Sequence, residues 1–248
     1  MKVKRPIVGL AVLAPAAWIA RSKLRSEHPV SAAKLIYKPV MKWAAHRALV
    51  GRNRSRHEPE KGRFTRADID HIIDQTGQNF EQLAPSVPRE RTVGNRMVML
   101  LACMTASFFR TLIAAGIERD YAIELFADVA WQIYEKGGIL PDLVTRVITR
   151  DPVERMRMRV SMFLRFPFNP PGYIFKRVPA NDGIAFNMLR CPAAEYFQAL
   201  GMADLCVSSW CNLDYGLAEM WGGRLERTGT LAGGADRCDF RFTATDGQ

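Results

Sequence analysis

The sequence contains few of the side chains that most often build catalytic and metal sites. It has only four histidines in 248 residues, and all lie in the first third: His28, His46, His57 and His71. It has no Walker loop and no GxGxxG, HExxH or GxSxG motif. These absences argue against the common nucleotide-binding, zinc-protease and serine-hydrolase signatures. A reactive site must therefore be sought among thiols and carboxylates.

Cysteine is also scarce. The five cysteines include no CxxC pair, and the one short spacing, Cys206-x4-Cys211, differs from the common zinc-ligand spacings. A disulfide framework is typical of secreted chains that are much shorter and richer in cysteine. We therefore predict reduced thiols in a cytosolic environment. The cofactor is unknown from the sequence, either none or a thiolate-bound metal.

Acidic residues are nearly absent from the start of the chain. Residues 1–66 carry 16 Lys and Arg but only three acids, which gives +13, whereas the other residues carry 19 basic and 22 acidic groups, which gives −3. A near-neutral body with a basic arm indicates contact with phosphate, of lipid or of nucleic acid. No nucleic-acid recognition motif accompanies the charge, so nucleic acid is the disfavoured partner.

An uncharged apolar segment, Ile7–Ala20, lies between Lys and Arg residues on both sides. It is typical of a secretory signal, a short membrane span or an interfacial anchor. Fourteen helical residues rise about 21 Å, less than the ~30 Å hydrocarbon core, and positive charges after the segment oppose translocation. An interfacial anchor requires neither full length nor cleavage and is favoured. The membrane-facing candidates are Ile7, Leu10, Leu13 and Trp18.

The next segment, residues 29–50, predicts a helix with a basic stripe, which Pro39 would kink or split. Lys34, Lys38, Lys42 and His46 recur every four residues. This stripe either meets an anionic membrane surface or is the solvated face of a helix packed on the body. We expect residues 1–63 to form a basic membrane-associating arm at the inner (cytoplasmic) membrane, with the body on the cytoplasmic side. A membrane-protein partner is a further alternative.

Residues 64–165 are predicted to be helical. Thr65 followed by Asp68 indicates a capped helix start. An almost wholly apolar helix is expected to end at Gly116, and we predict that it is a core helix because Arg110 would be costly inside a membrane. A third helix is expected from Arg119 to Lys136, closed by Gly137 and Gly138 and followed by shorter helices.

The segment 166–172 (FPFNPPG) is not helical and opens a strand-containing module, residues 166–243. Two strands are expected around a turn at 179–182, then a helix that begins at Pro192, a broken helical stretch, and two antiparallel strands near 224–231 and 238–243. Residues 64–248 are therefore predicted to form one α+β domain, in which a helical part precedes an antiparallel-strand and helix module.

Four of the five cysteines fall in this module: Cys191, Cys206, Cys211 and Cys238. Cys191 directly precedes the expected helix at Pro192, and a helix N-terminus lowers a thiol pKa. Two alternatives remain from residue types alone. Either the thiols and Asp214 form a reactive site, or the cysteines pack against nearby phenylalanines while Asp214 pairs with Arg227.

The order of these residues resembles that of the L-2-amino-thiazoline-4-carboxylic acid hydrolase family. The pattern is Cys191, Cys206, Cys211-x-x-Asp214, Arg227-Thr-x-Thr, and Gly234-x3-Cys238-Asp239-Phe-x-Phe242. The layout is similar over residues 65–243, and the distinctive residues lie within 191–242. A weaker similarity links the chain to the small-molecule-binding domains named after 4-vinyl reductase.

The resemblance implies a hydrolase that opens the ring of a small cyclic amidine by breaking a C–N bond. In that chemistry Asp214 positions water or binds the amidinium, while Arg227 and Asp239 bind the substrate. Cys206, Cys211 and Cys238 supply a nucleophile or a thiolate metal site. The alternative is a non-catalytic small-molecule-binding or accessory subunit tethered to a membrane partner. An enzyme is expected to gather its perturbed groups in one enclosed pocket, and a binding module is expected to scatter its cysteines around an apolar one.

Overall fold

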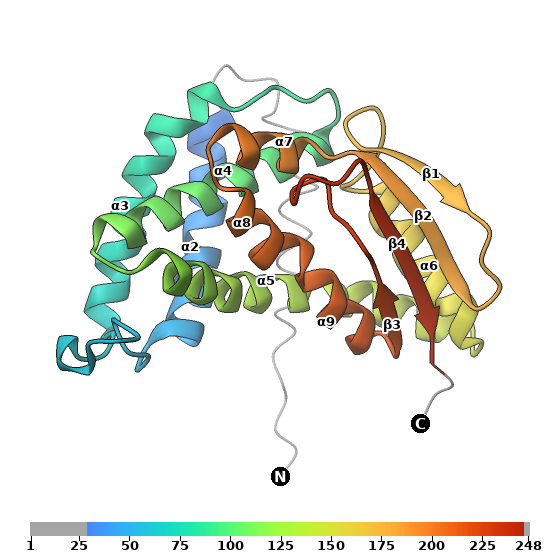
Figure 1. Cartoon of the computed structure of the whole chain (residues 1–248), viewed down its shortest axis with the longest axis horizontal. Helices are drawn as coiled ribbons and strands as arrows, with labels where there is room; N and C mark the ends of the chain where they lie inside the picture. The colour runs from blue at the N-terminus through green and yellow to red at the C-terminus, as the bar shows by residue number, and fades with distance from the viewer. Residues whose placement is uncertain (1–28, 246–248) are drawn as a thin grey trace, which may run out of the picture.

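The computed structural model describes residues 29–245, with side chains from residue 37 onward. The described chain has the predicted α+β order, in which helices come first and an antiparallel sheet follows (Figure 1). The long helices are α2 (Pro29–Leu49), α3 (Arg66–Leu83), α4 (Val93–Ala114), α5 (Arg119–Ile148) and α6 (Pro152–Arg165). The apolar positions Ile7, Leu10, Leu13 and Trp18 lie outside the described residues.

Helix α4 is the centre of the helical part. Thr92 caps its first turn by accepting from the Asn95 amide at 3.1 Å. α4 is the one helix in residues 29–245 that is long and apolar enough to cross a membrane, and 67% of its apolar window is buried by the protein itself. Arg110 lies on the exposed side of α4. The expectation of a core helix is therefore confirmed.

Helix α2 packs its apolar side on α3 and α5. Four of its small and aliphatic side chains belong to the common core: Met41, Ala44, Ala45 and Leu49. Its basic stripe faces acids of α3, because Lys38 pairs with Asp74 at 2.8 Å and Lys42 pairs with Asp70 at 3.0 Å. Pro39 lies inside α2 without splitting it. From residue 37 onward, α2 is therefore packed on the body of the protein, the second of the two alternatives expected for it. The Lys34 side chain is outside the described part.

The expected end of the third helix at Gly137 and Gly138 is wrong, because α5 continues through both glycines and through Pro141. Tertiary contacts explain the difference. A Cβ on Gly138 would lie 2.4 Å from Leu217 and from Met220, and the Trp221 Nε1–H donates to the Gly138 carbonyl at 3.0 Å. The glycine is therefore needed for close approach of a neighbouring helix and does not end α5.

The sheet has the order β1–β2–β4–β3, and all its neighbours are antiparallel. β1 (Ile174–Val178) and β2 (Gly183–Arg190) form the predicted hairpin, and β3 (Gly223–Glu226) and β4 (Cys238–Ala244) form the second predicted pair. β3 ends earlier than expected. Helix α6 packs on β2 and β4, behind the sheet in Figure 1.

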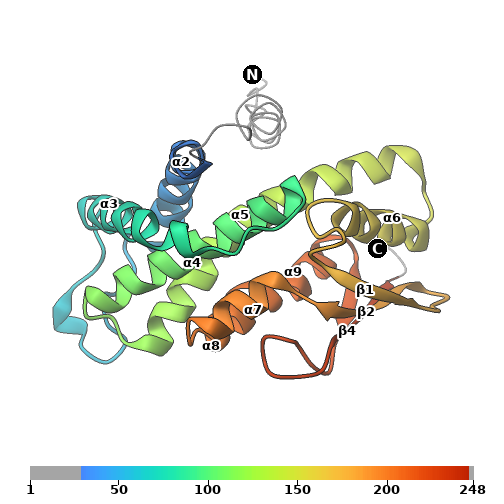
Figure 2. The same cartoon turned by 90° about the horizontal axis from the view of Figure 1, so that it is seen from above.

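A broken helical run connects β2 to β3, as the sequence predicts. It consists of α7 (Pro192–Ala199), α8 (Ala203–Cys206), a π-helical turn η3 (Val207–Cys211) and α9 (Leu213–Met220). This run packs across α5, and α9 also contacts β3. Figure 2 shows α8, α7 and α9 lying along one side of α5, with the α9 end next to the sheet. The run therefore brings its cysteines and Asp214 against residues of α5 and of the strands.

Candidate functional site

The candidate site is centred on the carboxylate of Asp214, in the first turn of α9. The Tyr134 hydroxyl of α5 donates to Asp214 Oδ1 at 2.7 Å, and Arg227 Nη1 donates to Oδ2 at 3.3 Å. The Asp214 side chain is 19% exposed, so the carboxylate lies mostly out of water. A phenol that precedes Asp214 by 80 residues and a guanidinium that follows it by 13 thus hold the two oxygens of one carboxylate.

The guanidinium of Arg227 is itself enclosed, because only 2% of its side chain is exposed. Its Nη2 donates to the Cys211 carbonyl at 3.0 Å, and its charged carbon lies 5.1 Å from the centres of the Tyr215 and Phe240 rings. Aromatic faces attract a guanidinium in this position. Both ends of the Arg227 fork are therefore engaged within the protein. The pairing of Asp214 with Arg227, which the sequence offered as the alternative to a reactive site, is therefore present.

The surroundings perturb the acidity of Asp214 strongly. Burial raises the pKa of Asp214 to about 6, although the hydrogen bonds from Tyr134 and Arg227 act in the opposite direction. Burial and the neighbouring carboxylate also raise the pKa of the Tyr134 hydroxyl well above its usual value. Asp214 is therefore a carboxyl group that exchanges a proton near neutral pH, beside a phenol that remains protonated.

The π-turn η3 brings Cys206 and Cys211 together. The Asn212 amide donates to the Val207 carbonyl at 2.9 Å, five residues back, as a π-turn requires. In an α-helix, residues five apart point in different directions, because one turn takes 3.6 residues. The wider turn places the two thiols within hydrogen-bonding reach. That bond lowers the pKa of Cys211, with help from the charge of Arg227, and raises the pKa of Cys206.

Cys191 and Cys238 lie around this pair, and the charges of these thiols influence one another. Burial raises the pKa of Cys191 to about 12 and that of Cys238 to about 11. The expected lowering at Cys191 is therefore wrong. The Ala194 amide does donate to the Cys191 sulfur at 3.4 Å, but desolvation is the larger effect. The fifth cysteine, Cys103, lies in α4, where burial raises its pKa and its neighbours are Tyr196, Ser107 and Arg110 in place of the other thiols.

Tyr173, which precedes β1, closes the thiol cluster from another side. The residue is 3% exposed, and its hydroxyl has no well-formed hydrogen bond. Burial raises the pKa of this phenol, and the thiols of Cys191 and Cys206 raise it further. A buried phenol without a good partner next to several thiols is a polar group still able to accept or donate a hydrogen bond.

Asp239 lies beside the site, and its carboxylate is occupied by hydrogen bonds from the loop that follows β3. Its carboxylate accepts from the Thr228 amide at 2.9 Å, the Thr228 hydroxyl at 2.6 Å and the Gly229 amide at 3.0 Å. These bonds overcome desolvation and lower the pKa of Asp239 to about 2. Asp239 thus fixes the backbone next to Arg227, and these bonds explain why β3 ends at Glu226.

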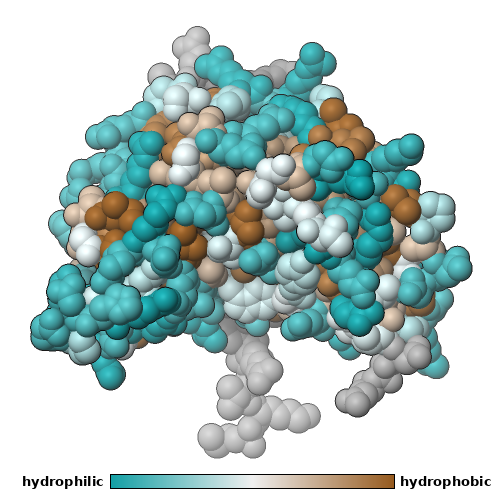
Figure 3. Space-filling view, in the orientation of Figure 1, coloured by the Kyte–Doolittle hydropathy of each residue, from teal (hydrophilic) through white to brown (hydrophobic). Residues whose placement is uncertain are grey.

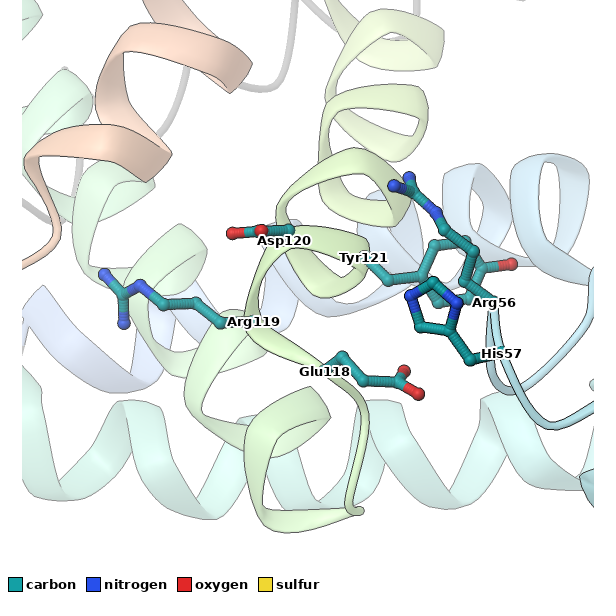
Figure 4. A pocket seen from close by; sticks show the side chains of 6 residues that line it. All are labelled: Arg56, His57, Glu118, Arg119, Asp120 and Tyr121. Carbon is teal, nitrogen blue, oxygen red and sulfur yellow. The ribbon is translucent and has the colours of Figure 1, made fainter.

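The described residues contain no group of three or more His, Cys, Asp and Glu side chains placed to hold a metal ion. A thiolate metal site therefore gains no support there. Two surface hollows lie elsewhere. One lies between the loop after α2 and the start of α5, where Figure 4 shows Arg56, His57 and Glu118 around it. The other lies along the β1–β2 hairpin. Neither hollow touches Asp214 or the thiols, so neither is the enclosed pocket expected for an enzyme. The candidate site is placed by the converging groups alone.

The comparison with protein families supports one of the two sequence resemblances. Residues 147–242 match the family model of L-2-amino-thiazoline-4-carboxylic acid hydrolase. The predicted resemblance is confirmed over this range, which begins in the last turn of α5 and includes all the distinctive cysteines and Asp214. No curated protein and no solved structure matches the chain. The similarity to the 4-vinyl reductase domains stays a prediction.

The matched range, residues 147–242, leaves out one contributor to the site. Tyr134 lies before residue 147, in the part of α5 that precedes the match. Sequence reasoning missed both Tyr134 and Tyr173, because a tyrosine in a helix or before a strand carries no local signal of its partner. The partner of Tyr134 is 80 residues away. Only the crossing of α5 by α9 brings the two together.

Proposed function

We propose that this protein is a membrane-associated hydrolase that opens the ring of a small cyclic amidine by breaking a C–N bond. One observation carries the proposal: Asp214, with its pKa near 6, is held between Tyr134 and Arg227 beside Cys211, whose pKa is lowered by its hydrogen bond with Cys206. Perturbed groups that converge in this way are characteristic of reactive sites. The match of residues 147–242 to a hydrolase family gives the reaction class.

Asp214 is the acid–base group of the proposal. A general base works best when its pKa lies near the operating pH, and about 6 meets that condition. As a carboxylate it accepts a proton from water that adds to the amidine carbon. The ring C–N bond then breaks, and the departing nitrogen takes the proton from Asp214. The added hydroxyl passes its remaining proton to the same nitrogen, so the carbon retains the oxygen as a carbonyl and the product carries a carbamoyl group and a free amine.

Arg227 has a different role from direct recognition of the substrate carboxylate. Its fork already binds Asp214 and the Cys211 carbonyl, and two rings enclose it. We infer that it orients Asp214 and lowers the pKa of Cys211. Lys cannot form the same fork, so Arg227→Lys is expected to disturb both neighbours.

Among the three thiols first proposed as nucleophiles, Cys211 suits the role best, because its pKa is the lowered one. In a covalent course its thiolate adds to the carbon of the protonated amidine, and the ring C–N bond breaks as the departing nitrogen takes a proton from Asp214. Water then adds to the same carbon and gives one proton back to Asp214 and the other to the released amine. The C–S bond to Cys211 breaks, which restores the thiolate and leaves the oxygen as a carbonyl. Cys206 would then hold the thiolate by hydrogen bonding, and Cys238 would remain protonated because burial raises its pKa to about 11. The intact mass of the protein during turnover distinguishes the two courses.

Membrane association is the second element of the proposal. Residues 1–66 carry +13, and Ile7–Ala20 is an uncharged apolar segment between Lys and Arg residues. Apolar segments with basic flanks bind anionic bilayers through burial of the apolar face and attraction to the headgroups. The proposed place is the cytoplasmic side of the inner membrane.

The test is release of the carbamoyl product from 2-aminothiazoline-4-carboxylate. Asp214→Asn keeps the size of the side chain but cannot act as a base, so we expect turnover to fall by about 10²–10⁴-fold. Asp236→Asn is the matched control, because Asp236 is exposed and pairs only with the adjacent Arg237. No turnover by the unmodified chain, together with measurable binding of another small molecule, would reject the enzyme and favour the ligand-binding alternative.

A further inference from the structure

The last part of α5 shows an apolar face that no part of the described protein covers. Five of its aliphatic side chains are exposed, and they fall within ten residues: Ile139, Leu143, Val144, Val147 and Ile148. Val147 alone is 89% exposed and Leu143 is 56% exposed. Residues 139, 143 and 147 follow the i, i+4 spacing of one helix face, and 144 and 148 extend it. We call these five residues the α5 stripe.

The side of α5 opposite this stripe is small and polar. Gly138, Pro141 and Thr145 are buried there, and the Thr145 hydroxyl binds the buried Arg159 at 2.8 Å. A helix on the surface of a soluble protein normally shows the reverse distribution, with aliphatic groups inside. On the face seen in Figure 3, hydrophobic residues form small patches separated by hydrophilic ones. A contiguous run such as the α5 stripe marks a contact surface.

We propose that the α5 stripe inserts into the headgroup region of an anionic lipid bilayer; this proposal rests on the membrane attachment proposed above. Figure 2 shows α2 and the last part of α5 along the same upper edge of the molecule, with the sheet on the other side. The chain enters α2 at Pro29, directly after the basic and apolar N-terminal segment. An anchor in that segment would therefore bring this edge to the bilayer.

The charges at the stripe favour lipid over a protein partner of the same kind. Arg146 is 58% exposed and pairs with Asp142, which is also bound by Arg159. Arg150 is exposed, and no partner for it occurs within residues 29–245. Two copies joined by this face would bring their arginines together, and residues 1–26 would add further Lys and Arg. Lipid phosphates instead neutralise them.

The experiment uses the full chain with Val147→Cys, labelled with a polarity-sensitive thiol dye. The matched control is Ile174→Cys on β1, which is 46% exposed and lies in the sheet. The unsubstituted chain, labelled in parallel, gives the contribution of the native thiols. With vesicles of phosphatidylcholine and phosphatidylglycerol, we expect a blue shift and protection from aqueous iodide at residue 147 only. Leu143→Ser with Val147→Ser should weaken vesicle binding by about tenfold.

Each other outcome contradicts the proposal in a distinct way. Vesicle binding with residue 147 still in water would overturn the α5 stripe but leave attachment by residues 1–26. No vesicle binding at all would overturn both. A blue shift without vesicles would mean that protein covers the stripe. If that shift depends on concentration, the cover is a second copy. If it disappears on deletion of residues 1–26, the cover is the N-terminal segment.

Discussion

At the scale of single residues, the site is defined by how burial competes with hydrogen bonding. Asp214 accepts bonds from a phenol and a guanidinium, yet its pKa rises, because desolvation of the carboxylate is the larger effect. Asp239 accepts three short bonds nearer the surface, and its pKa falls. The pKa values of two carboxylates in one module are therefore shifted in opposite directions. The raised pKa suits Asp214 for proton transfer, and the lowered pKa keeps Asp239 charged, so that it can hold a loop.

The raised pKa of Asp214 predicts how stability depends on pH. The folded state binds the proton more tightly than the unfolded state, whose pKa is 3.8, so this group makes the protein less stable as pH rises from about 4 to 6. Asp214→Asn removes that dependence. The free energy of unfolding of the variant, relative to the unmodified chain, should rise by up to about 3 kcal/mol between pH 4 and pH 7. Urea titrations of both proteins at several pH values measure this difference. If the free energies of unfolding of the two proteins changed with pH in parallel, the prediction would be contradicted.

The thiol pair gives a second prediction at this scale. Alkylation requires the thiolate, so Cys211 should react with iodoacetamide at a lower pH than an ordinary cysteine. Cys206→Ala removes the hydrogen bond to Cys211 and should move its reaction profile to higher pH. Peptide mass mapping of the alkylated sites over pH measures both profiles. Cys103→Ala is the control, because Cys103 lies in α4 away from the pair. An unchanged Cys211 profile in Cys206→Ala would refute the coupling.

Only part of the site could be predicted from residue types alone. The pairing of Asp214 with Arg227 was one of two alternatives that the residue types left open, and it belonged to the alternative without a reactive site. The contribution of Tyr134 was not predictable, since it depends on where α9 crosses α5. The lowered pKa of Cys211 was also not predictable from the sequence, because two cysteines separated by four residues come together in a π-turn but not in an α-helix.

At the scale of elements, local signals predicted the helix starts well. The Thr65–Asp68 capping box is present, and so are the starts at Asp151 and Cys191, each followed by proline. The continuation of α5 through two glycines was missed. A pair of glycines in a sequence predicts a helix end. Here Gly138 is instead required by the close approach of α9, whose residues Leu217 and Met220 come about 80 residues later in the chain. Tertiary packing overrides local propensity at this point.

The two glycines of α5 predict opposite effects of the same substitution. A Cβ on Gly137 meets nothing within 4 Å, whereas one on Gly138 would meet Leu217 and Met220 at 2.4 Å. Gly137→Ala should stabilise the protein by about 0.5–1 kcal/mol, because alanine is the better helix former. Gly138→Ala should destabilise it by about 1–3 kcal/mol through overpacking. Thermal and urea unfolding of the two variants provide the measurement. Equal effects would show that α9 does not press on α5.

At the scale of the whole molecule, the basic charge and the chemistry are separated along the chain. The site lies in the near-neutral part, in residues 134–239, whereas the +13 lies in residues 1–66. Part of that charge is already paired, because Lys38 and Lys42 bind acids of α3. The arginines of the loop after α2 are also paired, because Arg52 and Arg56 bind acids of α5 and Arg54 binds Asp68. The charge that remains for a membrane therefore lies mainly before α2. This division suits a catalytic body held at a surface by its first residues.

The last prediction tests that division. Removal of residues 1–26 takes away the apolar segment Ile7–Ala20 and six Lys and Arg residues, but leaves all of α2 and the candidate site. We expect the truncated protein to move from the membrane fraction to the soluble fraction. Its turnover of 2-aminothiazoline-4-carboxylate should stay the same, because Asp214, Tyr134 and the thiols lie in other elements. Fractionation of cells that express both forms measures the partition. A variant with Lys38→Ala and Lys42→Ala serves as the control: its partition should change little, since both lysines already bind α3. Unchanged partition after truncation would mean that the N-terminal segment is not the anchor.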